Sequence, residues 1–375
     1  MSSRRAVPIE QQEQPAISTI DLARHWKFWR LEKSDRPLLG LFLQPYIVPD
    51  VYRIAGEDDC LEPQQLKAER YFDLHLERHR LIQNLTQDFV RPVEPLNWMP
   101  WLEGVLGLPL KVKNQTVWAE HILEPERPLQ HLSVGWREDW LDAVLDYVRD
   151  LVKEFYPHIP VAGPFLRGPA DVVAAMLGTS RFCVELIDHP EEIRRLIALC
   201  ARAWVKVNRK VVEIIPEWQG GYFPGARWVH APHKCVYTSE DATSLISRKM
   251  YEEHILPANL QMAVKFQYGF VHRHSASLHN IESLCSLPRQ WAVEVTLDPS
   301  GPTLDRVLPV LKRVQQSQHP LIVFGINDTQ VLQALLDYLQ PEGLCLVVQS
   351  ETEEQAGILL DFFAKETNDS RSTSK

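Results

Sequence analysis

Short apolar runs alternate with longer segments of helical periodicity in the C-terminal third of the chain. The apolar runs lie at residues 267–272, 291–297, 321–325 and 344–349, and the helical patterns lie at 278–286, 303–316, 328–339 and 352–364. A short apolar run bounded by polar residues is typical of a buried strand, and a longer periodic segment is typical of an amphipathic helix. The pattern therefore predicts repeated strand–helix units and a largely parallel sheet.

The preceding part of the chain adds one clear strand and several helices. The strand is expected at residues 37–43, and the helices at 66–86, 140–155, 190–215 and after Ser239. Asp188 and the Pro-Glu-Glu sequence near it provide a cap, an early proline and first-turn carboxylates, all of which favour a helix start there. We expect the α/β class and a single (β/α)₈ barrel with N-terminal helical additions, the doubly wound open sheet being the alternative.

The ends of the chain differ from its middle. Residues 1–17 are rich in Gln, Glu, Ser and Pro, and residues 366–375 are small and polar. Segments of this composition do not bury enough apolar surface to fold, so both predict disordered tails. No long linker interrupts the stretch between them, and residues 18–365 are therefore expected to form one domain.

Composition narrows the class of protein. The chain has 375 residues, 45% of them hydrophobic and 24% charged, with a formal net charge of -9. The acidic balance disfavours nucleic acid and anionic lipid as partners. No apolar run approaches the roughly 20 residues that cross a bilayer, and the N-terminus lacks a signal-peptide pattern, so we expect a cytoplasmic protein with no membrane partner. The six cysteines are scattered without a CxxC pair, which favours reduced thiols.

Polar side chains follow each strand of the C-terminal third. His272 and His274 are two residues apart at the end of a strand, so their imidazoles point the same way. The later strand ends carry Glu294 with Asp298, Asn327 with Asp328, and Ser350 with Glu351. In a barrel these groups would surround one mouth, where metal ligation, proton transfer and binding of an anionic substrate are all open to imidazole. For each group alone, ordinary loop polarity is the alternative.

Residues 84–107 form a Pro-rich segment that carries charges and tryptophans. It contains Asp88, Arg91, Glu94, Trp98 and Trp101. Aromatic walls with a few fixed charges suit a small organic ligand. The alternative is that the tryptophans belong to the core and Arg91 pairs a surface carboxylate. Trp218, at the start of the Gly-rich segment 218–225, is a further candidate wall.

Common catalytic and nucleotide motifs are absent from the sequence. Neither GxGxxG nor the phosphate-binding GxxxxGK[ST] occurs, which gives no support to nucleotide binding. The GxSxG and HExxH patterns are also missing, and this disfavours the common hydrolase mechanisms.

Several segments resemble the uroporphyrinogen decarboxylase superfamily, which also contains corrinoid-linked methyltransferases. The matching segments are Gln87-Asp-Phe-Val-Arg-Pro, Gly163-Pro-Phe-Leu-Arg-Gly-Pro-Ala, Asp188-His-Pro-Glu, residues 239–247, Phe324-Gly-Ile-Asn-Asp and Thr352-Glu-Glu-Gln-Ala. Together they cover about residues 20–365. The resemblance implies a (β/α)₈ barrel.

The decarboxylase branch implies Asp88 as the catalytic carboxylate. A carboxylate at this place would stabilise a cationic intermediate while carbon dioxide leaves. Arg91 or Arg167 would hold a substrate carboxylate. The N-terminal substrate-binding motif of that branch is replaced here by residues 42–53.

The methyltransferase branch has His-x-Cys where this chain has His272-Arg-His274, and a second Cys near the last strand. The resemblance implies zinc, which holds a substrate thiol as the methyl-accepting thiolate, and a corrinoid carried by a partner protein. His274 replaces the first Cys, and no Cys occupies residues 347–349. We therefore predict a nitrogen and oxygen site from His272, His274 and Glu294, with Asp298 or Glu351 as alternative oxygen ligands.

Three hypotheses follow. The preferred one is methyl transfer on a small-molecule substrate, with Asp88, His272 and His274 as catalytic groups. The predicted substrate-binding residues are Arg91, Glu94, Trp98, Trp101, Arg167, Trp218, Asp298 and Asn327. The alternatives are a metal-independent decarboxylase and a non-catalytic ligand-binding barrel, the latter suggested by the missing sulfur ligands. The sequence leaves a homodimer open.

Overall fold

The structure is a computed structural model that describes residues 21–43, 55–56, 58–82, 85–97, 99–114, 116–123 and 127–372. Its centre is a curved, all-parallel sheet with strand order β1-β9-β8-β7-β6-β5. The strands are β1 (Leu38–Leu43), β5 (Cys235–Ser239), β6 (Tyr268–His274), β7 (Trp291–Thr296), β8 (Leu321–Ile326) and β9 (Leu344–Ser350). Apart from a few end residues they are buried, which explains their near-continuous apolar sequences. The α/β class is confirmed.

The described residues do not form the expected eight-stranded closed barrel. Within them, six strands of the main sheet form ladders, and the space between the edge strands β1 and β5 is crossed by segments joined through single bridges. The Asp88 amide donates to the Leu39 carbonyl, Val93 bridges Val161, and Arg167 bridges Ser239. Prolines explain the missing ladders: they lack an N–H, and they punctuate these segments at positions 92, 95, 160 and 164. The fold is therefore barrel-like, with an incomplete wall on one side.

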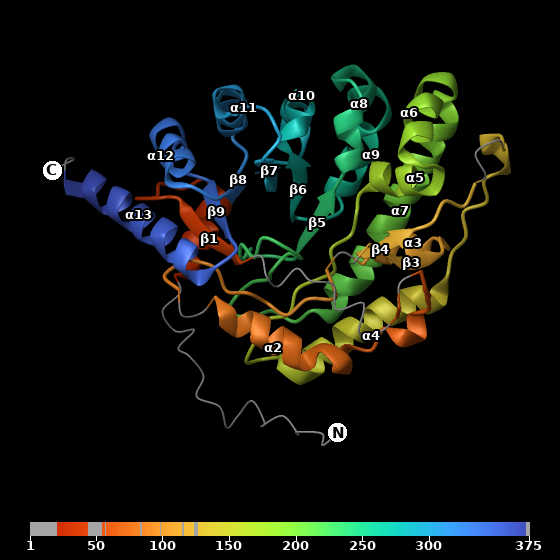
Figure 1. The fold of residues 1–375 in the computed structure, drawn as a ribbon, viewed down its shortest axis with the longest axis horizontal. Coiled ribbons are helices and arrows are strands. Elements are labelled where there is room, and N and C mark those ends of the chain that lie inside the picture. Colours follow the sequence, from red (N-terminus) through yellow and green to blue (C-terminus); the bar gives the residue numbers. More distant parts are fainter. Residues whose placement is uncertain are drawn as a thin grey trace.

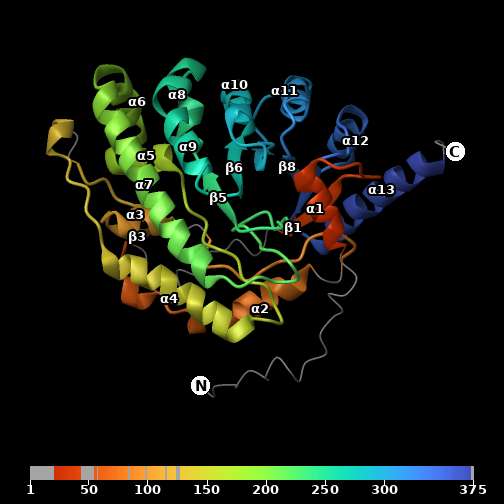
Figure 2. The ribbon, with the colours of Figure 1, turned by 180° about the vertical axis from the view of Figure 1, so that it is seen from behind.

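Helices line the outside of the sheet (Figure 1), and α1 lies beside β1 and α13 when the molecule is seen from behind (Figure 2). The helices are α1 (Leu22–Arg30), α2 (Phe72–Leu81), α3 (Trp101–Val105), α4 (Glu138–Phe155), α5 (Pro169–Leu177), α6 (Thr179–Asp188), α7 (Pro190–Ile214), α8 (Arg248–His254), α9 (Leu256–Ala263), α10 (Leu278–Ile281), α11 (Leu304–Gln316), α12 (Thr329–Tyr338) and α13 (Glu353–Ser372). The strand ranges expected in the C-terminal third match β6 to β9 closely, and α10 to α13 begin within one residue of the expected helix starts. No helix among the described ranges is both long and apolar enough to cross a membrane.

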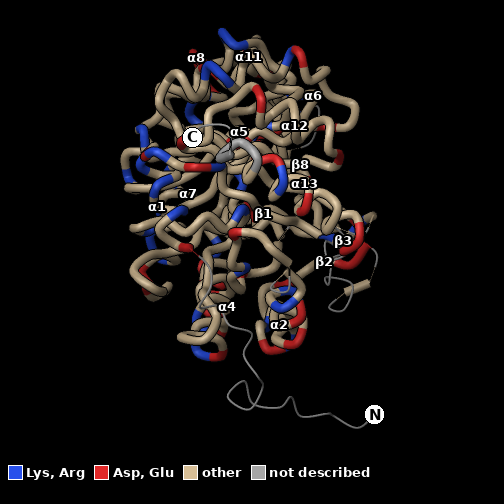
Figure 3. The backbone as a smooth tube through the Cα atoms, turned by 90° about the vertical axis from the view of Figure 1, so that its left-hand side faces the viewer, with Lys and Arg blue, Asp and Glu red and all other residues tan. Residues whose placement is uncertain are grey.

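Two regions differ from the sequence-based expectation. The helix expected at 66–86 shrinks to α2, because extended backbone at Lys67 separates two short 3₁₀ turns ahead of it. The chain also adds a small antiparallel sheet of β2 (Cys60–Leu61), β3 (Leu110–Lys113) and β4 (Thr116–Ala119). Figure 3 shows acidic and basic residues interspersed along outer helices such as α2 and α4.

The two ends of the chain were both expected to be disordered. Residues 1–17 lie outside the described part of the structure. At the C-terminus α13 continues through residues 366–372 instead of ending near 365. Thr367 is buried, and its hydroxyl donates to the Phe363 carbonyl at 2.8 Å, so the helix packs against the protein as far as Thr367.

Candidate functional site

A cavity of about 710 Å³ opens at the carboxyl ends of the parallel strands. Every strand of the main sheet contributes to its lining. The lining residues are Phe42, Glu94, Asn97, Phe165, Ala226, Arg227, Trp228, Tyr237, Asp241, His272, His274, Thr296, Leu297, Pro299, Phe324, Gly325, Asn327, Gln349, Ser350, Glu351 and Gln355. Ligand sites of barrels and open α/β sheets lie at this end of the strands, and the volume suits a small organic molecule.

Three potential metal ligands face one another in the cavity. His272 and His274 lie on the same side of β6, and Asp241 begins the 3₁₀ turn η8 (Asp241–Leu245), two residues after β5. The Asp241 Oδ1 atom is 3.6 Å from the His272 Nε2 atom and 3.8 Å from the His274 Nε2 atom. The β5–β6 register places Ser239 beside His272, so the segment that follows Ser239 reaches the two imidazoles directly.

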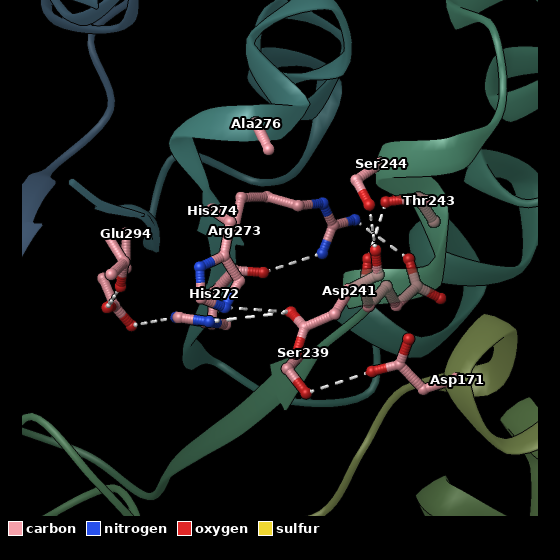
Figure 4. A network of polar contacts seen from close by, with 12 residues as sticks. Asp171, Ser239, Asp241, Thr243, Ser244, His272, Arg273, His274, Ala276 and Glu294 are labelled. Carbon is pink, nitrogen blue, oxygen red and sulfur yellow. Dashed lines mark hydrogen bonds and ion pairs between the residues drawn. The ribbon is translucent and has the colours of Figure 1, made fainter. Parts of the chain in front are cut away.

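Each imidazole has a carboxylate beside its other nitrogen. The Nδ1 atom of His272 lies 3.1 Å from Glu294, and that of His274 lies 2.5 Å from Asp298. Figure 4 shows Glu294 and Asp241 on opposite sides of the His272 ring. The β6–β7 register pairs His272 with Glu294, which explains why their side chains meet. Metal-binding histidines usually donate their second ring N–H to a carboxylate, which fixes the tautomer and the ring orientation.

The donor set fits a divalent cation. One ligand atom from each of Asp241, His272 and His274 lies within 4.8 Å of the other two. Zinc binds imidazole nitrogen and carboxylate oxygen at about 2.0–2.2 Å, so a cation among the three can approach all of them after small movements. Two imidazoles and one carboxylate leave coordination positions for a substrate, as in catalytic sites.

The carboxylate beneath His272 is ionised. Burial alone would raise the pKa of Glu294, but the charges of Arg227 and His272 outweigh it and lower this pKa to about 2. The Arg227 Nε atom donates to the Glu294 carboxylate at 2.9 Å. For Asp298, burial is likewise outweighed, and hydrogen bonds from His274 and Ser275 lower its pKa. Both ring partners therefore accept hydrogen bonds at neutral pH.

A third carboxyl group, that of Asp171 near Asp241, has its pKa raised instead of lowered. Asp171 is buried, and burial together with the negative charge of Asp241 raises its pKa to about 8. Its Oδ1 atom accepts a hydrogen bond from the Ala242 amide at 2.8 Å. This carboxyl group retains a proton near neutral pH.

The predicted site residues divide into two groups. His272, His274, Glu94 and Asn327 line the cavity, and Asp298 lies behind His274. Glu294 was predicted as a metal ligand, but it is fully buried between His272 and Arg227, where it orients the imidazole. Five further predicted residues do not line the cavity, namely Asp88, Arg91, Trp101, Arg167 and Trp218. Trp98 lies outside the described residues.

Asp88 has structural partners instead of a place in the cavity. Both of its carboxylate oxygens accept hydrogen bonds from Arg36, at 2.6 and 2.7 Å, and one also accepts from the Leu39 amide. Burial raises its pKa, but the Arg36 guanidinium more than offsets this, and the pKa of Asp88 is lowered. The carboxylate ties the segment after α2 to β1.

The other residues outside the cavity also have structural contacts. Trp101 is fully buried against Trp140 and Tyr147. Trp218 donates from Nε1 to the Pro157 carbonyl. These contacts agree with the core alternative for the tryptophans.

The two arginines in this group are also engaged. The Arg91 guanidinium lies over the Trp228 ring at 4.7 Å, and Arg167 pairs with buried Glu103 at 2.6 Å. Neither side chain reaches the cavity lining.

Sequence reasoning did not single out Asp241 or Arg227. Strand β5 is short and ends in Thr238 and Ser239, so its apolar pattern was too weak to mark Asp241 as a residue after a strand. Arg227 follows the Gly-rich turn of residues 218–225, which was noted only for its glycines and aromatics. The sequence offered one signal for each residue. Asp241 lies within residues 239–247, which resemble a superfamily segment, and Arg227 closely follows the Gly-rich segment 218–225.

Comparisons with known proteins bear on the fold. No family profile matches the sequence, and no curated protein sequence matches it either. Among solved structures, a methyltransferase from Methanosarcina mazei has a similar fold, with a TM-score of 0.63 and 13% sequence identity. The match covers 92% of this chain and 99% of the other. At this identity the likeness establishes a shared fold.

Proposed function

We propose that the protein is a metal-dependent enzyme that transfers a methyl group to or from a small organic substrate. The observation that carries the proposal is the cluster of Asp241, His272 and His274, whose imidazoles are each oriented by a carboxylate on Nδ1. The cluster lies at the carboxyl ends of the strands and borders a cavity large enough for a substrate. A purely structural histidine cluster does not require two fixed rings whose Nε2 atoms are both directed at Asp241.

The chain's own residues would prepare the site in two ways, by orienting the metal ligands and by excluding water. Glu294 and Asp298 hold the two rings so that both Nε2 atoms point toward Asp241. Bound zinc would supply the charge that keeps a substrate thiol ionised, and hence able to accept a methyl group. The aromatic side chains of the lining would exclude water from the methyl group as it moves.

Methyl transfer as the reaction is supported by two similarities. The sequence resembles a superfamily that contains corrinoid-linked methyltransferases, and the fold is similar to that of a methyltransferase. We propose a corrinoid on a partner protein as the methyl carrier. Such a carrier would supply the methyl group in electrophilic form, and Asp241, His272 and His274 would hold the cation beside which the substrate thiol gives up its proton to water.

Metal binding provides the first test. Protein purified without a histidine tag and stripped with a chelator should bind about one zinc ion per chain in calorimetry. The double variant His272→Ala/His274→Ala and the single variant Asp241→Asn should each bind zinc at least tenfold more weakly. His131→Ala, which removes an exposed histidine outside the cavity, should bind zinc like the wild type.

The reaction is tested separately with methylcobalamin and a small thiol. The zinc-loaded wild type should accelerate loss of the methyl–cobalt absorbance, and the Asp241→Asn variant should not. If the wild type binds no divalent cation, the metal site is wrong. Stoichiometric zinc without any methyl transfer would retain the site and refute the reaction.

A further inference from the structure

The guanidinium of Arg227 offers unused hydrogen-bond donors to the cavity. Its Nε atom donates to Glu294, and its flat face lies over the Phe324 ring at 3.8 Å. No described residue accepts a hydrogen bond from its two Nη groups. The side chain is only 13% exposed, and it lines the cavity. A mostly buried guanidinium with free Nη donors is well suited to bind an oxyanion in a bidentate manner.

The backbone holds this side chain in place. Ala226 and Arg227 both have positive φ angles, of 61° and 50°, a conformation that residues with a Cβ rarely adopt. The Ala226 amide donates to Glu94 at 3.0 Å. Gly225 packs so tightly that an added Cβ would lie 2.6 Å from the Gly163 carbonyl oxygen. Strained backbone that is fixed by its surroundings is frequent at ligand-binding sites.

The charges of the lining leave Arg227 with a distinct role. Among the described residues around the cavity, it is the one arginine or lysine, whereas Glu94, Asp241 and Glu351 are acidic. Glu94 already accepts hydrogen bonds from Asn97 and Ala226. An anionic group that enters this cavity is therefore attracted to Arg227 and repelled by Asp241. The two ends of a bound molecule are thereby distinguished.

Glu294 connects Arg227 to the candidate metal site. One of its carboxylate oxygens accepts from Arg227, and the other lies 3.1 Å from His272. The carboxylate is fully buried, so both neighbours are fixed relative to it. The Arg227 guanidinium is therefore held at a fixed position relative to His272. A molecule bound to this guanidinium can extend from it toward the candidate metal ligands.

We propose that Arg227 binds a small oxyanion group of the substrate, namely a carboxylate, sulfonate or phosphate. The substrate is then a short molecule with an oxyanion at one end and its reacting group at the other. The inference rests on the proposed function only in taking the bound molecule to be the substrate. Oxyanion binding itself requires neither the metal nor the reaction.

The test uses metal-free protein labelled with ¹⁵N-arginine. Acetate, methanesulfonate and inorganic phosphate are titrated separately at constant ionic strength, and the side-chain Nε–H signals of the arginines are followed. The Arg227→Lys variant identifies the Arg227 signal by its disappearance. We expect at least one of the three anions to shift that signal saturably, and the identity of that anion distinguishes the three head groups.

Two variants provide the matched comparison. Arg227→Lys keeps the positive charge beside Glu294 but loses the paired Nη donors, and it should bind the anion at least tenfold more weakly in calorimetry. Arg306→Lys alters an exposed arginine of α11 and should bind it like the wild type. An Arg227 signal that responds to none of the anions, or equal binding by Arg227→Lys, overturns the proposal. Zinc stoichiometry measured on the same preparation reports on the proposed function independently.

Discussion

Asp171 and Asp241 are close in space but differ in burial. Asp241 is exposed, whereas burial and the charge of Asp241 raise the pKa of Asp171 to about 8. The usual pKa of an aspartate is 3.8. Between about pH 4 and pH 8, folded Asp171 therefore keeps a proton that the unfolded chain releases. It follows that its contribution to stability declines as the pH rises through this window.

Asp171→Asn should remove this decline. The asparagine side chain can still accept from the Ala242 amide but carries no charge at any pH. Since one pKa unit corresponds to about 1.4 kcal/mol, we expect the stability of the metal-free variant relative to the wild type to increase by up to about 4 kcal/mol from pH 5 to pH 8. Urea unfolding at both pH values measures this. The same change in stability with pH in the wild type and in Asp171→Asn would contradict this prediction. Asp305→Asn, which alters an exposed carboxylate of α11, is the control and should behave like the wild type.

At the scale of elements, alternation along β6 divides its last three residues between two environments. His272 and His274 face the cavity, and Arg273 points to the opposite side, where it is fully buried. There Arg273 donates to Glu240 at 2.9 Å, and Glu240 directly precedes Asp241. This ion pair fixes the end of β5 against the end of β6. It therefore sets the positions of all three candidate ligands without touching them.

Removing one partner of this pair should be costly. Arg273→Met leaves Glu240 as an uncompensated buried charge, for which a loss of about 3–5 kcal/mol is typical. The double variant Glu240→Gln/Arg273→Met removes both charges and should recover part of that loss. Urea unfolding of both variants gives the comparison. Equal stability of the single and the double variant would show that the pair is not what holds these segments together.

The strands that bear the ligands were predictable, but the neighbours that complete the site were not. Continuous apolar runs marked β6 to β9 because these strands are buried on both faces, and the two histidines followed from period-two alternation. Asp241 could be found from sequence only by recognising β5, which is a short strand with a polar end. Glu294 was predicted from sequence as a metal ligand, whereas its contacts with Arg227 and His272 depend on tertiary register and were not predictable. The bridged segments escaped detection because prolines removed their strand pattern.

At the scale of the whole molecule, several histidines are buried in neutral form. Burial lowers the pKa of His75 to about 3, and those of His79 and His230 to about 4. The unfolded chain binds protons at these groups below about pH 6.5, whereas the folded protein does not. Their contribution to stability is therefore present above pH 6.5 and is lost as the pH falls.

Acid should consequently unfold the protein more readily than its acidic composition alone suggests. Each such histidine costs up to roughly 2 kcal/mol at pH 5 relative to pH 7. His79→Gln, whose amide can replace the hydrogen bond to the Arg91 carbonyl, should show a flatter dependence in urea unfolding at the two pH values. His131→Gln, at an exposed position, should behave like the wild type. A wild-type stability that is unchanged between pH 7 and pH 5 would refute this account.

The incomplete wall between β1 and β5 gives the cavity two kinds of lining. The candidate ligands on β6 belong to continuous hydrogen-bonded ladders, whereas Glu94, Asn97 and Phe165 come from segments held by isolated bridges. Amides in such segments open to solvent more often, because local stability follows the density of hydrogen bonds and packing. The side of the cavity lined by Glu94, Asn97 and Phe165 can thus widen or change in sequence. The two histidines on β6 keep their geometry meanwhile. If the proposed function holds, a new substrate range can therefore evolve without rebuilding the candidate metal site.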